Sequence, residues 1–264
     1  MASRLCLVGG GRMGEALLAG LLAAGWAPPE DLAVAEPVEA RRKQLAQRFP
    51  GVMVGAEPVA ADGAVVAVKP ADVEAACAAI AAAGARRVLS VAAGVPLGRL
   101  EQALGGGVAV VRAMPNTPAL VGAGAAAIAG GTAATLDDLE WAESLLAAVG
   151  TVVRVPEALL DAVTGLSGSG PAYVFLVAEA LTEAGVLAGL PRDVSARLTV
   201  QTLLGAARML AETGDTPEAL RAAVTSPGGT TAAGLRALEA AGVRSAFLEA
   251  VAAATARSRQ LGGG

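Results

Sequence analysis

Short apolar runs alternate with helical patterns through the first 155 residues. Strands are predicted over residues 4–8, 32–35, 52–54, 64–68, 88–91, 108–112, 123–128 and 152–155. Apolar residues at helical spacing predict intervening helices, among them 71–83 and 135–148. This alternation is typical of a mostly parallel sheet with helices on its faces.

The pattern changes near Pro156, after which no convincing strand follows. Helices are predicted over residues 157–167, 171–185, 191–212, 217–224, 231–241 and 243–261. We therefore predict an α/β domain over residues 1–155 and an all-α domain over 156–264. Ala-rich helices with little aromatic bulk make a poor solitary core, so burial between subunits is expected. We predict a homodimer, with a decamer of dimers as the larger alternative.

A glycine pattern joins the first strand to its helix. Gly9, Gly11 and Gly14 give G-x-G-x-x-G directly after the strand and at the start of a helical stripe. In a dinucleotide-binding turn, the three glycines allow the tight turn, the approach of the pyrophosphate and the close helix–strand contact. The alternative is a glycine-rich helix start without a ligand. In this context we predict a Rossmann-type nucleotide site.

The second strand ends at Glu36, about twenty residues past the glycines, where an acid typically binds the ribose 2′-hydroxyl of NAD. Arg41 and Arg42 follow. They are candidates for a 2′-phosphate, as in NADP, or for a solvated helix face. The sequence leaves NADP(H) and NAD(H) open.

Three further loops follow strands, where ligands bind in open parallel sheets. They contain Lys69, the segment 92–94, and Asn116. Each has a structural alternative, because proline-rich loops need small or polar neighbours. Lys69 is one of only two lysines in the chain, and direct cofactor contact is left open for it.

Two glycine-rich stretches interrupt the helical half. Residues 165–171 combine serines and glycines before Pro171, which suits either close helix packing or the approach of a ligand. Residues 225–231, Thr-Ser-Pro-Gly-Gly-Thr-Thr, precede a helix. The free N–H groups of that helix start would bind an anion, and the alternative is an ordinary capped start after a Pro-Gly turn.

Composition narrows the class of protein. Hydrophobic residues make up 54% and the mean hydropathy is +0.57, which raises the question of a membrane protein. The longest uncharged stretch, 113–136, contains two prolines and several glycines and is a poor bilayer span. The start of the chain lacks a long apolar core, so we expect a soluble cytoplasmic protein. A net charge of −4 and 2% aromatic residues argue against nucleic-acid binding.

Several residue types are missing. The 264 residues include no histidine, and two cysteines without a C-x-x-C pattern, so we expect no metal site and no Ser-His triad. The remaining chemistry must use hydroxyls, backbone amides, carboxylates or a lysine.

Segments spread over most of the chain resemble the pyrroline-5-carboxylate reductase family. They are residues 8–13, 67–70, 92–95, 114–118, 161–173 and 225–231. The last two are highly specific, whereas the first is shared with many dehydrogenases. The resemblance implies a Rossmann-type N-terminal domain and an all-α C-terminal dimerisation domain. It also implies reduction of 1-pyrroline-5-carboxylate to L-proline, the last step of proline biosynthesis, with NADPH or NADH.

The same resemblance implies roles for individual residues. Each active site would combine cofactor from one subunit with the helical domains of the dimer. Thr231 is the catalytic candidate, lying against the ring nitrogen. The substrate-binding candidates are Ser226, Gly228, Gly229, Thr230 and Thr231. The cofactor-binding candidates are Gly9, Gly10, Gly11, Arg12, Met13, Glu36, Ala67, Val68, Lys69, Pro70, Ala92, Ala93, Gly94 and Asn116. Ala223 stands where family members often have an asparagine, and its effect on cofactor binding stays open.

Imine reduction suits a chain without histidine. Hydride transfer to a C=N bond needs positioning and a proton at nitrogen more than it needs a nucleophile. Lactate-type enzymes use a histidine, β-hydroxyacid dehydrogenases use a lysine in the helical domain, and short-chain enzymes use a Tyr–Lys pair. None of these is present here: no lysine follows Lys69, and Tyr173 is followed by Val177. The alternative is a catalytically silent dinucleotide-binding sensor or scaffold.

Overall fold

The computed structural model describes residues 3–262 and divides into two compact units. The sheet unit comprises the described residues up to Ser169 together with those from Ala253 onward, and the helical unit is Gly170–Ala252. The domain boundary near residue 155 stays a prediction, but the division by contacts falls at Ser169. The end of the last helix belongs to the sheet unit, which the sequence pattern does not indicate.

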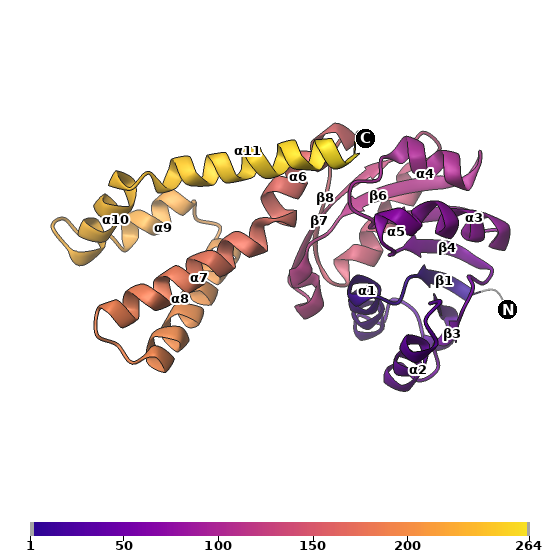
Figure 1. Ribbon diagram of the computed structural model, residues 1–264, viewed down its shortest axis with the longest axis horizontal. Helices are drawn as coiled ribbons and strands as arrows, with labels where there is room; N and C mark the ends of the chain where they lie inside the picture. Colours follow the sequence, from indigo (N-terminus) through magenta and orange to yellow (C-terminus); the bar gives the residue numbers. More distant parts are fainter. Residues whose placement is uncertain (1–2, 263–264) are drawn as a thin grey trace. The chain divides into compact units, whose positions relative to one another are not determined.

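The sheet unit is built on eight strands in the order β3-β2-β1-β4-β5-β6-β7-β8 (Figure 1). All neighbouring pairs are parallel except β6 and β7. The strands are β1 (Ser3–Val8), β2 (Leu32–Ala35), β3 (Met53–Gly55), β4 (Ala61–Val66), β5 (Arg87–Ser90), β6 (Ala109–Met114), β7 (Gly124–Gly130) and β8 (Gly150–Arg154). The carboxyl ends of β1, β2, β4, β5 and β6 therefore meet at one edge of the sheet.

Alternate side chains of the strands enter two separate cores. On β1, Leu5 and Leu7 lie in one core, and Cys6 and Val8 lie in the other. Helices α1 (Arg12–Ala23), α2 (Glu39–Arg48) and α5 (Leu136–Ala147) contribute to the first core; α3 (Val73–Ala83), α4 (Leu97–Leu104) and α6 (Leu160–Val163) contribute to the second. A sheet buried on both faces explains the nearly continuous apolar strands. The prediction of a Rossmann-type fold is confirmed.

One predicted helix, over residues 157–167, takes three conformations. A 3-10 turn (Glu157–Leu159) leads into α6, and a π-helical turn (Thr164–Gly168) follows. The hydroxyls of Thr164 and Ser167 donate to carbonyls four residues earlier, at 2.8 and 3.1 Å. Hydroxyl bonding to the backbone and nearby glycines weaken a regular α-helix here.

The helical unit starts with two closely packed helices, α7 (Gly170–Leu187) and α8 (Arg192–Glu212), which lie side by side in Figure 1. A Cβ placed on Gly185 would lie 2.1 Å from Ser195 Oγ, and this hydroxyl donates to Thr182 O at 2.8 Å. Helices α9 (Pro217–Ala223), α10 (Thr230–Ala240) and α11 (Val243–Gly262) follow, with α11 passing into the sheet unit at Ala253. The prediction of an all-α second half is confirmed.

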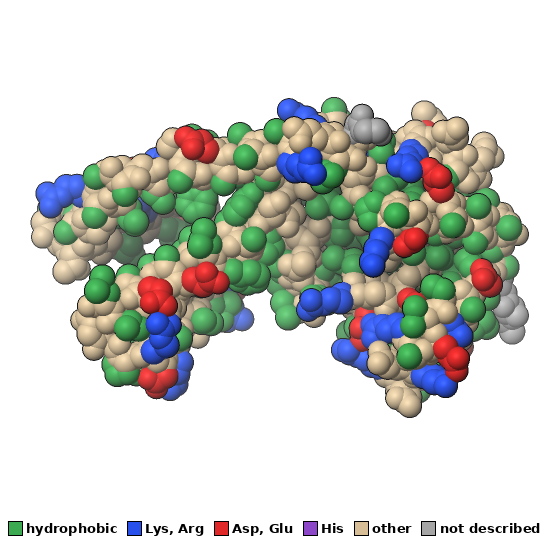
Figure 2. All heavy atoms as spheres, in the orientation of Figure 1, with side chains coloured by type: hydrophobic (Ala, Val, Ile, Leu, Met, Phe, Trp, Pro, Cys, Tyr) green, Lys and Arg blue, Asp and Glu red, His purple; other side chains and the backbone are tan. Residues whose placement is uncertain are grey.

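Large apolar side chains are exposed on the helical unit, where Figure 2 shows them among charged groups. Phe175, Leu176 and Val200 are each more than 60% exposed. Among the described residues, the single helical stretch that is long and apolar enough to cross a membrane, by length and composition alone, is Glu157–Leu187, with a mean hydropathy of 1.3. Exposed apolar patches of this kind mark surfaces that another molecule covers.

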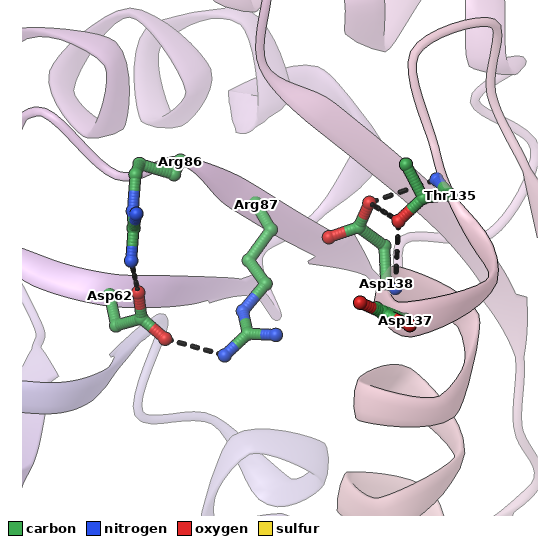
Figure 3. A pocket seen from close by; sticks show the side chains of 6 residues that line it. All are labelled: Asp62, Arg86, Arg87, Thr135, Asp137 and Asp138. Carbon is green, nitrogen blue, oxygen red and sulfur yellow. Dashed lines mark hydrogen bonds and ion pairs between the residues drawn. The ribbon is translucent and has the colours of Figure 1, made fainter.

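A charged cluster lies at the amino ends of the strands, around a cavity of about 290 Å³. Figure 3 shows Asp62 of β4 between the guanidinium groups of Arg86 and Arg87, with Thr135 and Asp138 bonded to each other across the first turn of α5. Arg87 also lies over the ring of Trp141, 4.8 Å from its centre. Asp62, Arg86 and Arg87 are already paired with one another and lie at the edge opposite to the glycine turn, so we assign them a structural role.

The Asp62 carboxylate has a pKa below its usual value, because Arg86 hydrogen-bonds it and Arg87 adds a second bond and charge. A lowered folded-state pKa stabilises the protein above the unfolded pKa of about 4 and loses that effect as pH falls through the folded pKa. We predict that Asp62→Asn lowers the free energy of unfolding by about 1 kcal/mol at pH 7, and by progressively less towards pH 3.

Urea unfolding between pH 7 and pH 3 measures this difference. Asp215→Asn is the control, because Asp215 is exposed and makes no ion pair among residues 3–262. A deficit in Asp62→Asn that stays constant with pH would contradict the assigned role of the ion pairs.

Candidate functional site

The turn between β1 and α1 brings three stretches of backbone unusually close together. Gly9 has φ +106°, and a Cβ there would lie 2.5 Å from Ala67 O. A Cβ on Gly14 would lie 2.1 Å from Gly9 O. Side chains do not fit at either position, so both glycines are required by the contact of α1 with the strands.

Gly11 differs from these two glycines. A Cβ there would meet no protein atom within 4 Å, and its φ of −68° suits any residue. Gly11 is the N-cap of α1 and makes no side-chain capping bond. The open space faces a helix start with unpaired N–H groups, which is what a pyrophosphate requires. The residues present therefore fit a dinucleotide.

Glu36 follows β2 beside this turn and is only 8% exposed. One carboxylate oxygen accepts the N–H of Gly10 at 2.9 Å, and the other accepts the N–H of Val38 at 2.9 Å. Arg41 donates from Nε to the carbonyl of Gly10 at 2.7 Å. The predicted Glu36 and the glycine turn are therefore joined by direct hydrogen bonds.

The other predicted cofactor residues follow neighbouring strands. Ala67 and Val68 lie just beyond β4, which ends two residues earlier than predicted, and Lys69 is exposed beside them. A cavity of about 410 Å³ opens at this edge. Its lining includes Pro70, Ala93 and Gly94 from the predicted set. These loops thus share one cavity within the sheet unit.

Part of this cavity comes from the glycine-rich stretch that was expected to suit either helix packing or a ligand, and part from the end of α11, which sequence reasoning missed. Thr164 and Ser169 from the π-helical region line it, together with Arg257 and Ser258 from the end of α11. Ser258 donates to Asp161 Oδ1 at 2.6 Å, which fastens the end of the chain to α6. Helical periodicity alone gives no signal for this contact.

Asn116 was predicted to bind cofactor, and its side chain already holds two protein groups. Its Nδ2 donates to Ser167 O at 3.0 Å, and its Oδ1 accepts the N–H of Ala125 at 2.8 Å. It is 9% exposed. Asn116 therefore connects β7 with the π-helical turn, and cofactor contact remains a separate prediction.

The predicted substrate loop lies in the helical unit, at the start of α10. Gly228 has φ +71°, and Gly229 donates to Ser226 O at 3.1 Å. A Cβ on Gly229, the N-cap of α10, would lie 2.4 Å from Ser226 Oγ. The N-cap makes no side-chain capping bond, and Thr230 and Thr231 are exposed. The loop therefore presents first-turn N–H groups and hydroxyls to solvent.

The cysteines do not supply a nucleophile. Burial raises the pKa of the Cys77 thiol to about 11, with the charge of Glu74 as a smaller cause. Burial also raises the pKa of Cys6. Both thiols are protonated at neutral pH and therefore unreactive. Within residues 3–262, no group of His, Cys, Asp and Glu side chains is arranged to hold a metal ion.

The glycine turn, its acidic partner and the cavity at the carboxyl edge of the sheet have the arrangement of a dinucleotide-binding Rossmann site, and the comparisons with known proteins show an NAD(P)-dependent oxidoreductase. Known proteins agree with this class. A family described as "Pyrroline-5-carboxylate reductase dimerisation" matches residues 157–261, and "NADP oxidoreductase coenzyme F420-dependent" matches 4–94.

A pyrroline-5-carboxylate reductase from Synechocystis sp. is 48% identical over 99% of both chains. The solved structure of one from Coxiella burnetii is 37% identical, with a TM-score of 0.92 over 99% of both chains. One from Plasmodium falciparum, solved with NADP bound, is 30% identical with a TM-score of 0.83 over 98% of both. The chain belongs to the pyrroline-5-carboxylate reductase family.

The open space at Gly11 gives a direct test of the cofactor site. We predict that Gly11→Ala weakens binding of the reduced cofactor at least about tenfold, since the new methyl group occupies the space that the pyrophosphate needs. The free energy of unfolding should change by no more than about 1 kcal/mol, the usual range for an N-cap substitution.

Fluorescence titration with reduced cofactor and urea unfolding measure the two effects. Gly98→Ala in α4 is the matched control, because Gly98 is also near a helix start with no atom within 4 Å. Unchanged cofactor affinity in Gly11→Ala would place the pyrophosphate elsewhere.

Proposed function

We propose that this chain reduces 1-pyrroline-5-carboxylate to L-proline with a reduced nicotinamide dinucleotide. The main support is the exposed start of α10, where Gly229 leaves first-turn N–H groups without a side-chain cap beside two threonines. The same chain has the dinucleotide turn and 48% identity to a named pyrroline-5-carboxylate reductase. The anion site and the cofactor site are the two parts that this reaction needs.

The cofactor site would use the turn residues and the edge loops. The backbone of residues 9–13 and the start of α1 would hold the pyrophosphate, and Glu36 would hold the adenosine ribose. The nicotinamide end would bind near Pro70, Ala93 and Gly94, which line the cavity at this edge. When bound, the reduced nicotinamide supplies the hydride that is added to the carbon of the C=N bond.

The substrate would be held by the loop before α10. Its carboxylate would accept hydrogen bonds from the N–H groups of the first turn and from the hydroxyl of Ser226. The positive φ of Gly228 shapes the turn, and Gly229 leaves room beside Ser226 Oγ. The carboxylate thereby becomes the anchor that orients the ring.

The ring nitrogen must receive a proton when the carbon receives hydride. We assign the hydrogen bond to this nitrogen to the hydroxyl of Thr231, which is exposed beside the proposed carboxylate site. A cyclic imine is basic enough to be protonated near neutral pH, so a hydroxyl that orients the nitrogen and relays the proton is sufficient. This chemistry needs no histidine, and the chain has none.

The helical unit would form a homodimer in the cytoplasm. The match of residues 157–261 to a dimerisation family supports this, as do exposed apolar groups such as Phe175 and Leu176. A second copy would bury this surface, which explains its hydropathy without a membrane. The larger assembly that we propose as the alternative is a decamer of dimers.

Incubation of the protein with reduced cofactor and 1-pyrroline-5-carboxylate tests the activity. Absorbance of the reduced cofactor at 340 nm should fall in step with the formation of L-proline, and it should stay constant without the imine. Cofactor binding without turnover would instead support a silent dinucleotide-binding protein.

We predict that Thr231→Val lowers kcat by one to three powers of ten, about the range for a lost proton donor or positioning hydroxyl. Valine keeps the shape of threonine but has no hydroxyl. Thr231→Ser keeps the hydroxyl and should retain most of the activity. Steady-state kinetics with the imine measure both variants. Equal kcat values for valine and wild type would remove Thr231 from the mechanism.

A further inference from the structure

Cofactor choice depends on the charges beside the adenosine ribose. NADPH carries a 2′-phosphate where NADH has a hydroxyl, so the two differ by a dianionic group at one position. A carboxylate there favours the hydroxyl, and a guanidinium available for bonding favours the phosphate. Both residue types lie at the end of β2, and their contacts distinguish the two possibilities.

The carboxylate of Glu36 is fixed beside the ribose position. It is 8% exposed, and each oxygen accepts one backbone N–H, from Gly10 and from Val38, both at 2.9 Å. Each oxygen retains acceptor capacity for a hydroxyl. A 2′-phosphate would instead meet the buried carboxylate of Glu36, which its two backbone hydrogen bonds hold at this position.

Arg41 binds the backbone of the turn directly, and protein groups hold all three of its nitrogens. Nε donates to Gly10 O at 2.7 Å, Nη1 donates to Gln44 Oε1 at 3.1 Å, and Nη2 pairs with Glu15. The side chain of Glu15 is only 16% exposed, and its second oxygen pairs with Arg48. Glu15 therefore neutralises Arg41, the arginine of α2 that binds the turn and would otherwise be available to a phosphate.

Arg42 is the arginine at the end of β2 that would favour a 2′-phosphate most. Its Nη1 donates to the carbonyls of Glu36 and Pro37, at 2.8 and 2.7 Å, and leaves other nitrogens for a ligand. Arg42 is half-buried, and the carboxylate of Glu36 lies at the same position. With Arg41 held by Glu15, the charges at the end of β2 favour the hydroxyl.

We infer that this chain prefers NADH to NADPH, and that Glu15 sets the preference together with Glu36 by holding Arg41 away from a 2′-phosphate. Glu36 is the residue that accepts the ribose hydroxyl, and Glu15 is a positioning residue that acts through Arg41. The inference deepens the proposed function, because it names the cofactor of the proposed reaction. It rests on that function only for the identity of the reaction, since the preference between the two cofactors can be measured by binding alone.

Binding measurements test the preference without the imine. Calorimetric titration should give NADH at least about tenfold higher affinity than NADPH, and 5′-AMP higher affinity than 2′,5′-ADP. Equal affinities, or tighter binding of the 2′-phosphorylated compounds, would overturn the inference and would assign the 2′ position to Arg42. Failure of imine reduction with this binding order intact would count against the proposed function alone.

Two variants test the assigned residues. Glu15→Gln releases Arg41 and Arg48, and it should raise the affinity for 2′,5′-ADP at least about tenfold while changing that for 5′-AMP little. Glu36→Gln should narrow the ratio between NADH and NADPH mainly by weakening NADH. Glu39→Gln is the control, because Glu39 lies on the same side of the sheet in α2 but pairs with exposed Lys43.

The direction of each change separates a cofactor role from a structural one. A merely structural loss in Glu15→Gln would weaken both adenosine nucleotides equally, and that result would overturn the role of Glu15. If Glu36→Gln does not fold, the Glu15 variant and the wild-type affinities still decide the inference.

Discussion

The close approach of backbone at the turn after β1 determines much of the sheet unit. Gly14 lies against the carbonyl of Gly9, and Gly9 lies against the carbonyl of Ala67, at distances that exclude a Cβ. This contact places the start of α1 at the carboxyl edge of the sheet. It also places Gly10 where Glu36 and Arg41 both bond to its backbone. One steric constraint therefore positions the proposed pyrophosphate site and the proposed ribose site together.

The proposed chemistry uses the start of a helix twice. In the sheet unit, Gly11 leaves the start of α1 open for a pyrophosphate, and in the helical unit Gly229 leaves the start of α10 open for a carboxylate. Glycine at both N-caps gives room for an anion where a larger side chain would occupy it. Backbone N–H groups and hydroxyls then perform the work of binding, which suits a chain without histidine.

Local patterns predicted the fold well because its elements have strong periodicity. Alternation of strands and helices, with Gly9, Gly11 and Gly14 after the first strand, was sufficient for the Rossmann-type unit. The π-helical turn was missed because hydroxyl bonding by Thr164 and Ser167 competes with α-helix geometry. The return of α11 to the sheet unit was missed because it depends on the long-range bond of Ser258 to Asp161.

The candidate site was less predictable from the sequence than the fold. Glycine spacing predicted a nucleotide-binding turn, but the sequence left the role of Arg41 open, since pairing with Glu15 requires two helices to meet. Asn116 follows a strand, as a ligand-binding residue would, and its amide also joins Ala125 and Ser167, which the sequence did not indicate. The position of a residue after a strand predicts that it lies at the carboxyl edge of the sheet. The partners of its side chain depend instead on tertiary contacts.

A crystal structure of the protein with NADH and L-proline tests the central claim most directly. The account predicts the pyrophosphate at the start of α1, the proline carboxylate on the N–H groups at the start of α10, and Thr231 Oγ1 within about 3 Å of the ring nitrogen. Proline bound away from residues 226–231, or a ring nitrogen held by a different side chain, would contradict it.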